Sequence, residues 1–250
     1  MNLLISNDDG IDAPGLLALE ARMVTLGNVT TVAPDSERSA QSHALTLNDP
    51  LRVVPAGPQR WAVDGTPADA VYLAVHHLVD RHPDVVLSGI NLGSNLGNDI
   101  HYSGTVAAAR EACLHGMPAV SISLHKTPEQ REIWWETACD VAERVVRQVV
   151  QRPPPAWVHL NVNVPNVPPD QLRGVRACLL GRRTYTPLVD LRLDPRGRKY
   201  FWIGGPHDRF EPEERSDGRA VEDGWASITP IHAFPTHAPT LEALKEWTDE

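Results

Sequence analysis

The chain has 250 residues, of which 42% are hydrophobic, and this length is enough for one large domain with a substantial core. Its formal net charge of −9 and its pI of about 5.6 disfavour a non-specific binder of nucleic-acid polymers, because such proteins depend on positive surface charge. Three cysteines without C-x-x-C spacing favour a reducing compartment, and no apolar run approaches the ~18 residues of a membrane-spanning helix, so we expect a cytoplasmic protein that does not enter a membrane.

Apolar runs alternate with amphipathic stretches over the first two thirds of the chain. The runs predict buried strands at residues 3–5, 29–33, 84–87, 119–123 and 158–164. Helices are expected after Pro14, from Thr66 to about Arg81, from Thr105 to Leu114, and between Thr127 and Pro153, with a capping box at Thr127–Gln130. This alternation indicates βαβ units and a Rossmann-like, doubly wound, mainly parallel α/β sheet, which binds ligands beyond the carboxyl ends of its strands.

The pattern becomes less regular after the proline-rich break at residues 153–155. Residues 178–205 suggest a hairpin with its turn at 195–197, residues 225–231 suggest one more strand, and the tail at 240–250 suggests a short helix. We therefore expect a single domain over residues 1–250, with a core of about 1–165 and a hairpin and C-terminal excursion over about 175–250.

Asp8 and Asp9 follow the first predicted strand and are flanked by Asn7 and Gly10. A tight turn there could aim both carboxylates at one hard cation, because two adjacent carboxylates repel each other unless a cation or a proton intervenes. The alternative is a plain turn in which Asp12 caps the next helix.

The segment from Gly89 to Asp99 carries three glycines at a spacing of four, with asparagines among them. It lacks the spacing of a dinucleotide-binding motif and the lysine of a P-loop, but its length is typical of functional loops. Ser103-Gly104-Thr105 then opens a helix, whose free N–H groups and hydroxyls could hold a phosphate. Simple capping of that helix is the alternative.

Ser36 to Ser39 follow the second predicted strand, on the same edge of the sheet as Asp8. Ser39 could bind a metal and Arg38 a phosphate, although a solvated loop would have the same composition. The eleven histidines show no zinc-binding spacing, and no G-x-S-x-G sequence supports a serine hydrolase.

Together these segments resemble the SurE stationary-phase survival proteins, a family of metal-dependent 5′/3′-nucleotidases. The matching stretches occur in order along nearly the whole chain: SNDDGIDAPG at 6–15, APDSERSAQSHALTL at 33–47, GTPAD at 65–69, SGINLGSNLGNDIHYSGTVAAA at 88–109, GMPAV at 116–120 and SITP at 227–230. The residues after Pro230 depart from the acidic ending of that family, which leaves the role of the tail in assembly open.

The resemblance implies one divalent metal ion, Mg²⁺ or Mn²⁺, held by Asp8, Asp9, Ser39 and Asn91. It also implies phosphate binding by Asn95, Ser103, Gly104 and Thr105, and a homodimer or homotetramer assembled through a projecting hairpin and a C-terminal segment. Water activated by the metal would attack the phosphate of a nucleoside 5′(3′)-monophosphate. The general acid stays unassigned, with His101 a candidate by proximity in sequence. A non-catalytic nucleotide-binding sensor on the same fold is the alternative function.

Overall fold

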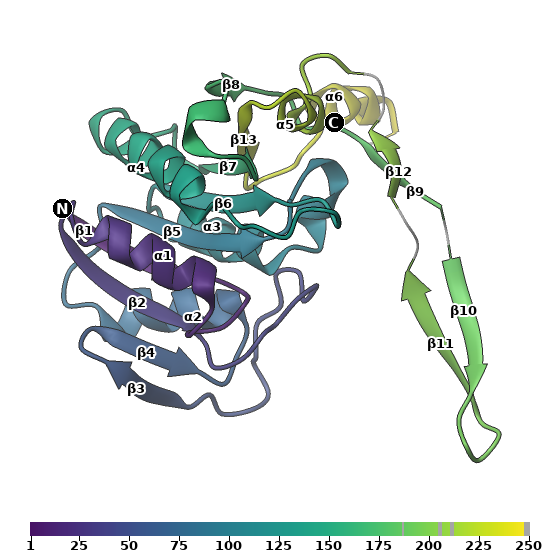
Figure 1. The fold of residues 1–250 in the computed structure, drawn as a ribbon, viewed down its shortest axis with the longest axis horizontal. Coiled ribbons are helices and arrows are strands. Elements are labelled where there is room, and N and C mark those ends of the chain that lie inside the picture. The colour runs from purple at the N-terminus through teal and green to yellow at the C-terminus, as the bar shows by residue number, and fades with distance from the viewer. Residues whose placement is uncertain (187, 205–206, 211–212, 248–250) are drawn as a thin grey trace.

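The computed structural model describes residues 1–186, 188–204, 207–210 and 213–247 (Figure 1). Nine of the described strands form one sheet in the order β3-β4-β2-β1-β5-β6-β7-β13-β8. They are β1 (Asn2–Ser6), β2 (Asn28–Pro34), β3 (Val53–Gly57), β4 (Arg60–Val63), β5 (Val85–Leu92), β6 (Ala119–His125), β7 (Val158–Pro165), β8 (Val175–Ala177) and β13 (Ala226–His232). Neighbours from β4 to β7 pair in parallel, while β3 is antiparallel to β4 and β13 to β7. The mainly parallel, doubly wound α/β fold expected from the sequence is confirmed.

Helices cover both faces of this sheet. The apolar side chains of α1 (Pro14–Met23) and α4 (Trp135–Gln151) pack on one face, and those of α2 (Pro67–Leu73) and α3 (Gly104–Leu114) pack on the other. The consecutive residues Leu3, Leu4 and Ile5 of β1 are therefore all buried, with Leu4 in one core and its two neighbours in the other. This explains why residues 3–5 form a continuous apolar run instead of an alternating pattern.

Two helix boundaries differ from the prediction. The helix that begins at the Thr66–Asp69 capping box ends as α2 at Leu73 and continues as a π-helix, η1 (Ala74–Leu78), so the helical segment stops before Arg81. The capping box expected at Thr127 is wrong as a helix start, because Thr127 and Gln130 close a separate turn and α4 begins at Trp135. In that turn the Thr127 N–H donates to Gln130 Oε1 at 3.0 Å.

Two strand assignments also differ from the prediction. Residues 89–92, which were expected in a glycine-rich loop, extend β5 past a cis peptide bond between Gly89 and Ile90. A side chain at Gly89 would place its Cβ 2.3 Å from the carbonyl oxygen of Ile122 on β6, so only glycine fits this close approach. The pair β3 and β4, at one edge of the sheet, was not predicted.

The predicted hairpin is present and projects far from the body of the molecule (Figure 1). Its outer part is an antiparallel pair, β10 (Leu188–Leu193) and β11 (Lys199–Gly204), which we call the arm. A second antiparallel pair, β9 (Arg183–Tyr185) and β12 (His207–Phe210), connects the arm to the body. Asp217, at the start of α5 (Asp217–Glu222), accepts the N–H groups of Gly97 and Gly181, each at 2.9 Å, and so joins the chain that enters β9 to the 3₁₀-helix that begins at Gly97.

The segment after residue 165 contributes β8 and β13 to the main sheet. The remaining short elements are the 3₁₀-helices η2 (Gly97–His101), η3 (Pro169–Gln171) and η4 (Lys245–Trp247), and the helix α6 (Ala238–Leu244) in the tail. The tail helix was predicted over 240–250, of which 248–250 lie outside the described residues. Within the described ranges, no helix has the length and apolar character needed to cross a membrane.

Candidate active site

A cavity of 340 Å³ opens at the carboxyl ends of β1, β2 and β5. The chain builds the sheet outward in one direction from β1 and in the other from β5, so the cavity lies at the point where the strand order reverses. Doubly wound sheets bind their ligands at this point. The cavity is lined by Asp8, Asp9, Glu37, Ser39, Ala40, Asn91, Leu92, Asn95, Asp99, Tyr102, Ser103 and Tyr185.

Asp8 is joined directly to the start of helix α3. Its Oδ1 accepts the hydroxyl of Thr105 at 2.6 Å, and both residues are buried. The backbone of Thr105 also hydrogen-bonds the Asp8 carboxylate, as suits an anion at a helix N-terminus. A Cβ on Gly104 would lie 2.8 Å from Asp8 Cβ, so glycine is needed for the helix to approach this closely.

The ionised forms of Asp8 and Asp9 are destabilised in this cavity. Burial raises the pKa of Asp8 above its ordinary value, although the hydrogen bonds from Thr105 oppose that shift. The pKa of Asp9 rises to about 6, first because of burial and second because of repulsion from Asp8. Glu37 and Asp99 add two further carboxyl groups, and none of the described residues that line the cavity is a lysine or an arginine. An ionised Asp8–Asp9 pair therefore has no compensating cation among the described residues that line the cavity.

The other two predicted metal ligands lie in the same cavity. Ser39 comes from the segment after β2, and its hydroxyl donates to Glu37 Oε1 at 2.7 Å. Asn91, near the end of β5, donates its amide Nδ2 to the carbonyl oxygen of Gly93 at 2.7 Å, which fixes the orientation of its side chain. The set of two carboxylates, a hydroxyl and an amide oxygen offers only oxygen donors, which fits Mg²⁺ or Mn²⁺. The described part of the chain contains no group of three or more His, Cys, Asp or Glu side chains suited to a metal.

Asn95 and Ser103 form a further part of the cavity wall. Asn95 is held by the sheet. Its side-chain Nδ2 donates to Ser123 Oγ at 2.8 Å, and its backbone carbonyl oxygen accepts the side-chain amides of Asn161 and Asn163. Ser103 caps α3, where its Oγ accepts the Val106 N–H at 3.0 Å. The capping role expected as the alternative is thus observed, and the Ser103 hydroxyl also lines the cavity.

Residues 38–46, which carry Ser39, form no helix or strand, yet side-chain bonds hold them along their length. The Ser42 hydroxyl donates to the His101 carbonyl oxygen at 2.6 Å, and Thr46 donates its N–H and its hydroxyl to Asp69 at 2.9 and 2.7 Å. Between them, His43 Nε2 lies 2.6 Å from Glu111 Oε2 on α3. We call residues 38–46 the clamped segment.

Some predicted residues lie outside the cavity. Thr105 is fully buried, and its hydroxyl contacts Asp8 and the Asn95 amide. Neither Thr105 nor its neighbour Gly104 lines the cavity. Arg38 turns its guanidinium to Asp35 and to the Asp64 carbonyl oxygen. The His101 side chain is exposed and is absent from the lining.

Asp12 does not cap α1, whose N-cap is Ala13 without a side-chain bond.

The sequence reasoning missed five lining side chains that are chemically useful: Glu37, Leu92, Asp99, Tyr102 and Tyr185. Four of them lie within a few residues of predicted ligands, so their proximity along the chain was the available signal. Tyr185 comes from β9, and no local pattern connects it to this site.

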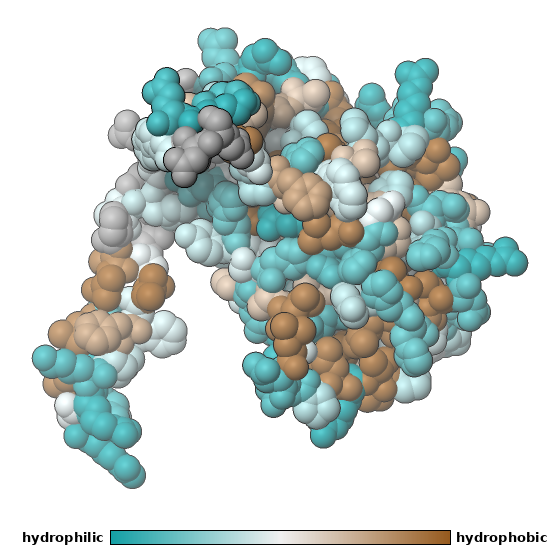
Figure 2. Space-filling model, turned by 180° about the vertical axis from the view of Figure 1, so that it is seen from behind, coloured by the Kyte–Doolittle hydropathy of each residue, from teal (hydrophilic) through white to brown (hydrophobic). Residues whose placement is uncertain are grey.

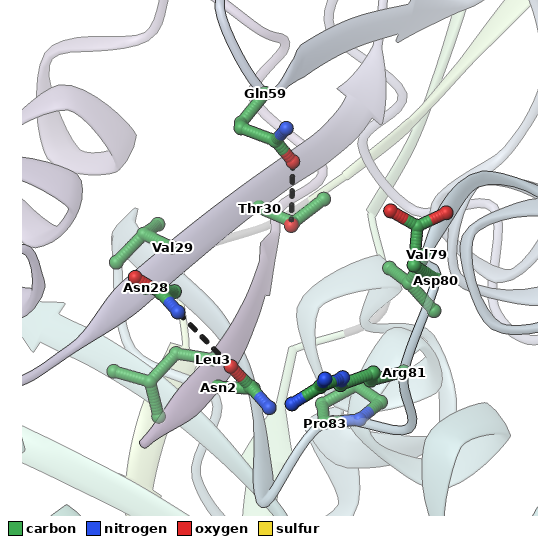
Figure 3. Close-up of a pocket in the computed structure, with 10 residues that line it drawn as sticks. All are labelled: Asn2, Leu3, Asn28, Val29, Thr30, Gln59, Val79, Asp80, Arg81 and Pro83. Atoms are coloured by element: carbon green, nitrogen blue, oxygen red, sulfur yellow. Dashed lines mark hydrogen bonds between the residues drawn. The ribbon is translucent and has the colours of Figure 1, made fainter.

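A second cavity, of 380 Å³, lies at the amino ends of β1 and β2, away from the residues described above (Figure 3). Its amide and hydroxyl groups bond to one another, with Asn28 Nδ2 donating to Asn2 Oδ1 at 3.4 Å and the Thr30 hydroxyl donating to Gln59 Oε1 at 3.3 Å. Asp80 is the one carboxylate among the described residues that line it. Without a carboxylate pair, this cavity does not match metal-dependent chemistry.

Comparisons with known proteins agree with the geometry. A protein named "5'-nucleotidase SurE" from Anaeromyxobacter dehalogenans is 50% identical over 99% of this chain and 96% of its own length, and one of the same name from Pelobacter propionicus is 45% identical over 99% of both chains. The solved structure titled "Crystal Structure of Sure Protein from Aquifex aeolicus" matches over 100% of both chains with a TM-score of 0.88 and 36% identity. The sequence profile described as "Survival protein SurE" matches residues 3–187, and the chain therefore belongs to the SurE family.

Proposed function

We propose that this protein is a 5′-nucleotidase, a phosphoric monoester hydrolase that converts nucleoside 5′(3′)-monophosphates to nucleoside and phosphate with one divalent metal ion, Mg²⁺ or Mn²⁺. The relatives that carry the name 5'-nucleotidase SurE align with nearly the whole chain. The single structural observation that supports metal dependence is the charge of the cavity: Asp8, Asp9 and Glu37 line it without a lysine or arginine among the described lining residues, while the fourth carboxyl group, Asp99, is paired with Arg183. A phosphate dianion would be repelled from this cavity unless a cation were bound there as well.

The candidate site residues fall into two groups, one for the metal ion and one for the phosphate. A divalent cation held by Asp8, Asp9, Ser39 and Asn91 supplies positive charge for the phosphate and makes a water molecule more acidic. Asp8 is fixed for this role by the bonds from Thr105.

We assign the phosphate to the start of α3. The Ser103 hydroxyl would donate a hydrogen bond to one of its oxygens, with Asn95 beside it. Gly104 and Thr105 lie behind the lining and would act on the phosphate through the positive end of the helix dipole. These groups would stabilise negative charge as it shifts toward the leaving oxygen. The helix start therefore serves both an aspartate and the substrate, and the Thr105 hydroxyl is committed to the aspartate.

A non-catalytic nucleotide sensor on the same fold is the competing function. A passive anion site would gain nothing from Asp8 and Asp9, because both carboxylates are destabilised by burial in the absence of a cation. This cost favours an enzyme over a sensor.

We also propose that the protein acts on small nucleotides in the cytoplasm and assembles as a homodimer or homotetramer. The net charge of −9 and the acidic cavity disfavour nucleic-acid polymers, and all three cysteines are free and buried, which suits a reducing compartment. The arm exposes several large apolar side chains, among them Val189, Trp202 and Ile203. Figure 2 shows hydrophobic residues gathered on the arm near its attachment and hydrophilic residues at its tip. Such a surface suits contact with another copy of the chain.

The test is phosphate release from AMP by purified protein that has been treated with EDTA and dialysed. We expect no release without metal and recovery of activity on addition of Mn²⁺ or Mg²⁺. Full activity of the metal-stripped protein would refute the metal mechanism. If AMP bound without phosphate release under every metal condition, the sensor would be the correct function.

A further inference from the structure

Three large apolar side chains stand around the cavity: Leu92, Tyr102 and Tyr185 are 45%, 66% and 43% exposed. Two polar residues of the same cavity are far less accessible, with Asp8 at 5% and Ser103 at 8%, whereas Glu37 and Ser39 are exposed. The cavity thus has a polar floor, which includes Asp8 and Ser103, and a mixed rim in which the three apolar side chains stand beside Glu37 and Ser39. Its volume of 340 Å³ falls in the range of pockets that hold whole small molecules, and it exceeds what a phosphate group alone would fill.

The ring of Tyr185 is fixed in place by Asp99. Its hydroxyl donates to Asp99 Oδ1, while Arg183 Nη1 lies 2.5 Å from Asp99 Oδ2. Burial, followed by the hydrogen bond to Asp99, raises the pKa of Tyr185 to about 12, so the phenol stays neutral. With its polar end bonded to Asp99, Tyr185 presents mainly its ring to the cavity.

Tyr102 is attached to the same short helix. Asp99 lies within η2, and the Tyr102 N–H donates to the Asp99 carbonyl oxygen at 3.0 Å. The Arg183 N–H donates to Asn98 Oδ1 at 2.7 Å, which binds β9 to η2 a second time. The backbone of Tyr102 and the ring of Tyr185 are therefore held by η2 before any ligand arrives, which lowers the conformational entropy lost on binding.

We propose that Tyr102 and Tyr185 form the wall that binds the planar base of the nucleoside whose phosphate lies on the polar floor. This inference rests on the proposed nucleotidase function and names its specificity-determining residues. An aromatic base is uncharged, so it tolerates the acidic cavity, and its flat face matches the exposed tyrosine rings. Stacking of a base on an aromatic side chain contributes ~1–3 kcal/mol, or about a 5- to 150-fold difference in affinity. Because Tyr185 belongs to β9, the strand that leads into the arm, the attachment of the arm is part of the substrate site.

The test compares AMP with ribose 5-phosphate, which has the same phosphate ester but no base, in the presence of Mn²⁺. For Tyr185→Leu and Tyr102→Leu we expect the ratio of the KM for AMP to the KM for ribose 5-phosphate to rise at least fivefold. Tyr185→Phe keeps the ring and should retain most of the discrimination. Tyr72→Leu removes a tyrosine of α2 that is 44% exposed, nearly as exposed as Tyr185, and does not line the cavity, so it serves as the matched control with the wild-type ratio. A ratio in Tyr185→Leu and Tyr102→Leu equal to that of the wild type would overturn the proposal, even if both substrates were hydrolysed more slowly.

Calorimetric binding of adenosine separates this inference from the proposed function, because adenosine carries no phosphate. Wild type should bind adenosine at least fivefold more tightly than Tyr185→Leu. Adenosine binding of this kind in a protein that releases no phosphate from either ester would contradict the nucleotidase function and leave the aromatic wall supported. Conversely, an active enzyme whose affinity for adenosine is the same in both proteins would retain the function and overturn the wall.

Discussion

Replacing Thr105 with valine removes one hydroxyl from the buried contact with Asp8 and keeps the shape of the side chain. The bond from Thr105 Oγ1 to Asp8 Oδ1 is 2.6 Å long, and neither partner is solvated. A hydrogen bond to a charged group contributes ~1.5–3 kcal/mol, so its loss should raise the pKa of Asp8 further above its ordinary value. A metal ion needs the ionised carboxylate.

We therefore expect Thr105→Val to bind Mn²⁺ about 10- to 100-fold more weakly at pH 6. The deficit should shrink as the pH rises, because a higher pH favours the ionised carboxylate in both proteins. Calorimetric titration of Mn²⁺ into the metal-free proteins at several pH values measures the effect. Thr105→Ser keeps the hydroxyl and should bind Mn²⁺ nearly as wild type does.

Thr137 offers a matched control on α4. It is also buried, and its hydroxyl donates to the Val167 carbonyl oxygen at 2.6 Å. Thr137→Val should lose about 1 kcal/mol of stability without any change in Mn²⁺ affinity. If Thr105→Val bound Mn²⁺ as tightly as wild type at pH 6 but lost kcat/KM, its hydroxyl would serve the phosphate, and the reasoning from the Asp8 contact would be wrong.

Three further predictions address the charges, the division of the site and the assembly. Asp9→Asn should lower kcat by ~100-fold or more and weaken Mn²⁺ binding. Ser103→Ala should keep Mn²⁺ affinity and lower kcat/KM by the ~1.5–3 kcal/mol of a hydrogen bond to a charged group. If calorimetry on folded variants showed that Ser103→Ala loses Mn²⁺ and Asp9→Asn keeps it, the metal and phosphate assignments would be reversed. In metal-free protein, Asp9 has a folded-state pKa of about 6 against an ordinary value of 3.8, so its proton stabilises the native state at low pH. The free energy of unfolding of wild type, measured by urea denaturation relative to Asp9→Asn, should therefore fall by about 1–2 kcal/mol as the pH rises from 3.8 to about 6, and a flat difference would contradict the pKa shift. Light scattering at micromolar concentration should give the mass of a dimer or a larger species, and a monomer mass would argue against assembly through the arm.

The parts of the fold that the sequence predicted are those with strong local signals. The continuous apolar run at residues 3–5 lies in a strand buried on both faces, and Thr66 with Asp69 forms the capping box that starts α2. In contrast, Pro55 interrupts the apolar alternation of β3, and β3 lies at the sheet edge, where a missing N–H is tolerated. The extension of β5 to Leu92 was hidden because it depends on contacts with β6 across a shift in register.

For the candidate site, position along the chain identified residues but not their contacts. Asp8, Ser39 and Asn91 follow or end neighbouring parallel strands, so their convergence on one cavity could be expected from topology. The contact between Thr105 and Asp8 joins residues 97 positions apart and depends on how closely α3 approaches β1. Tyr185 reaches the cavity only because the arm is attached beside η2. No hydrophobic periodicity in the sequence predicts that attachment.

The clamped segment has a consequence for the thermodynamics of metal binding. An irregular segment that carries a ligand would ordinarily have to be ordered when the ion binds, at ~1–2 kcal/mol for each residue fixed. Here His43, Ser42 and Thr46 already hold residues 38–46 against α3, η2 and α2. The conformational entropy of this segment is therefore lost when the protein folds and not when the ion binds. The binding free energy of the ion then contains no cost for ordering the segment. If Ser39 holds the metal as proposed, Glu111 on α3 contributes to that site through His43, which it keeps in place.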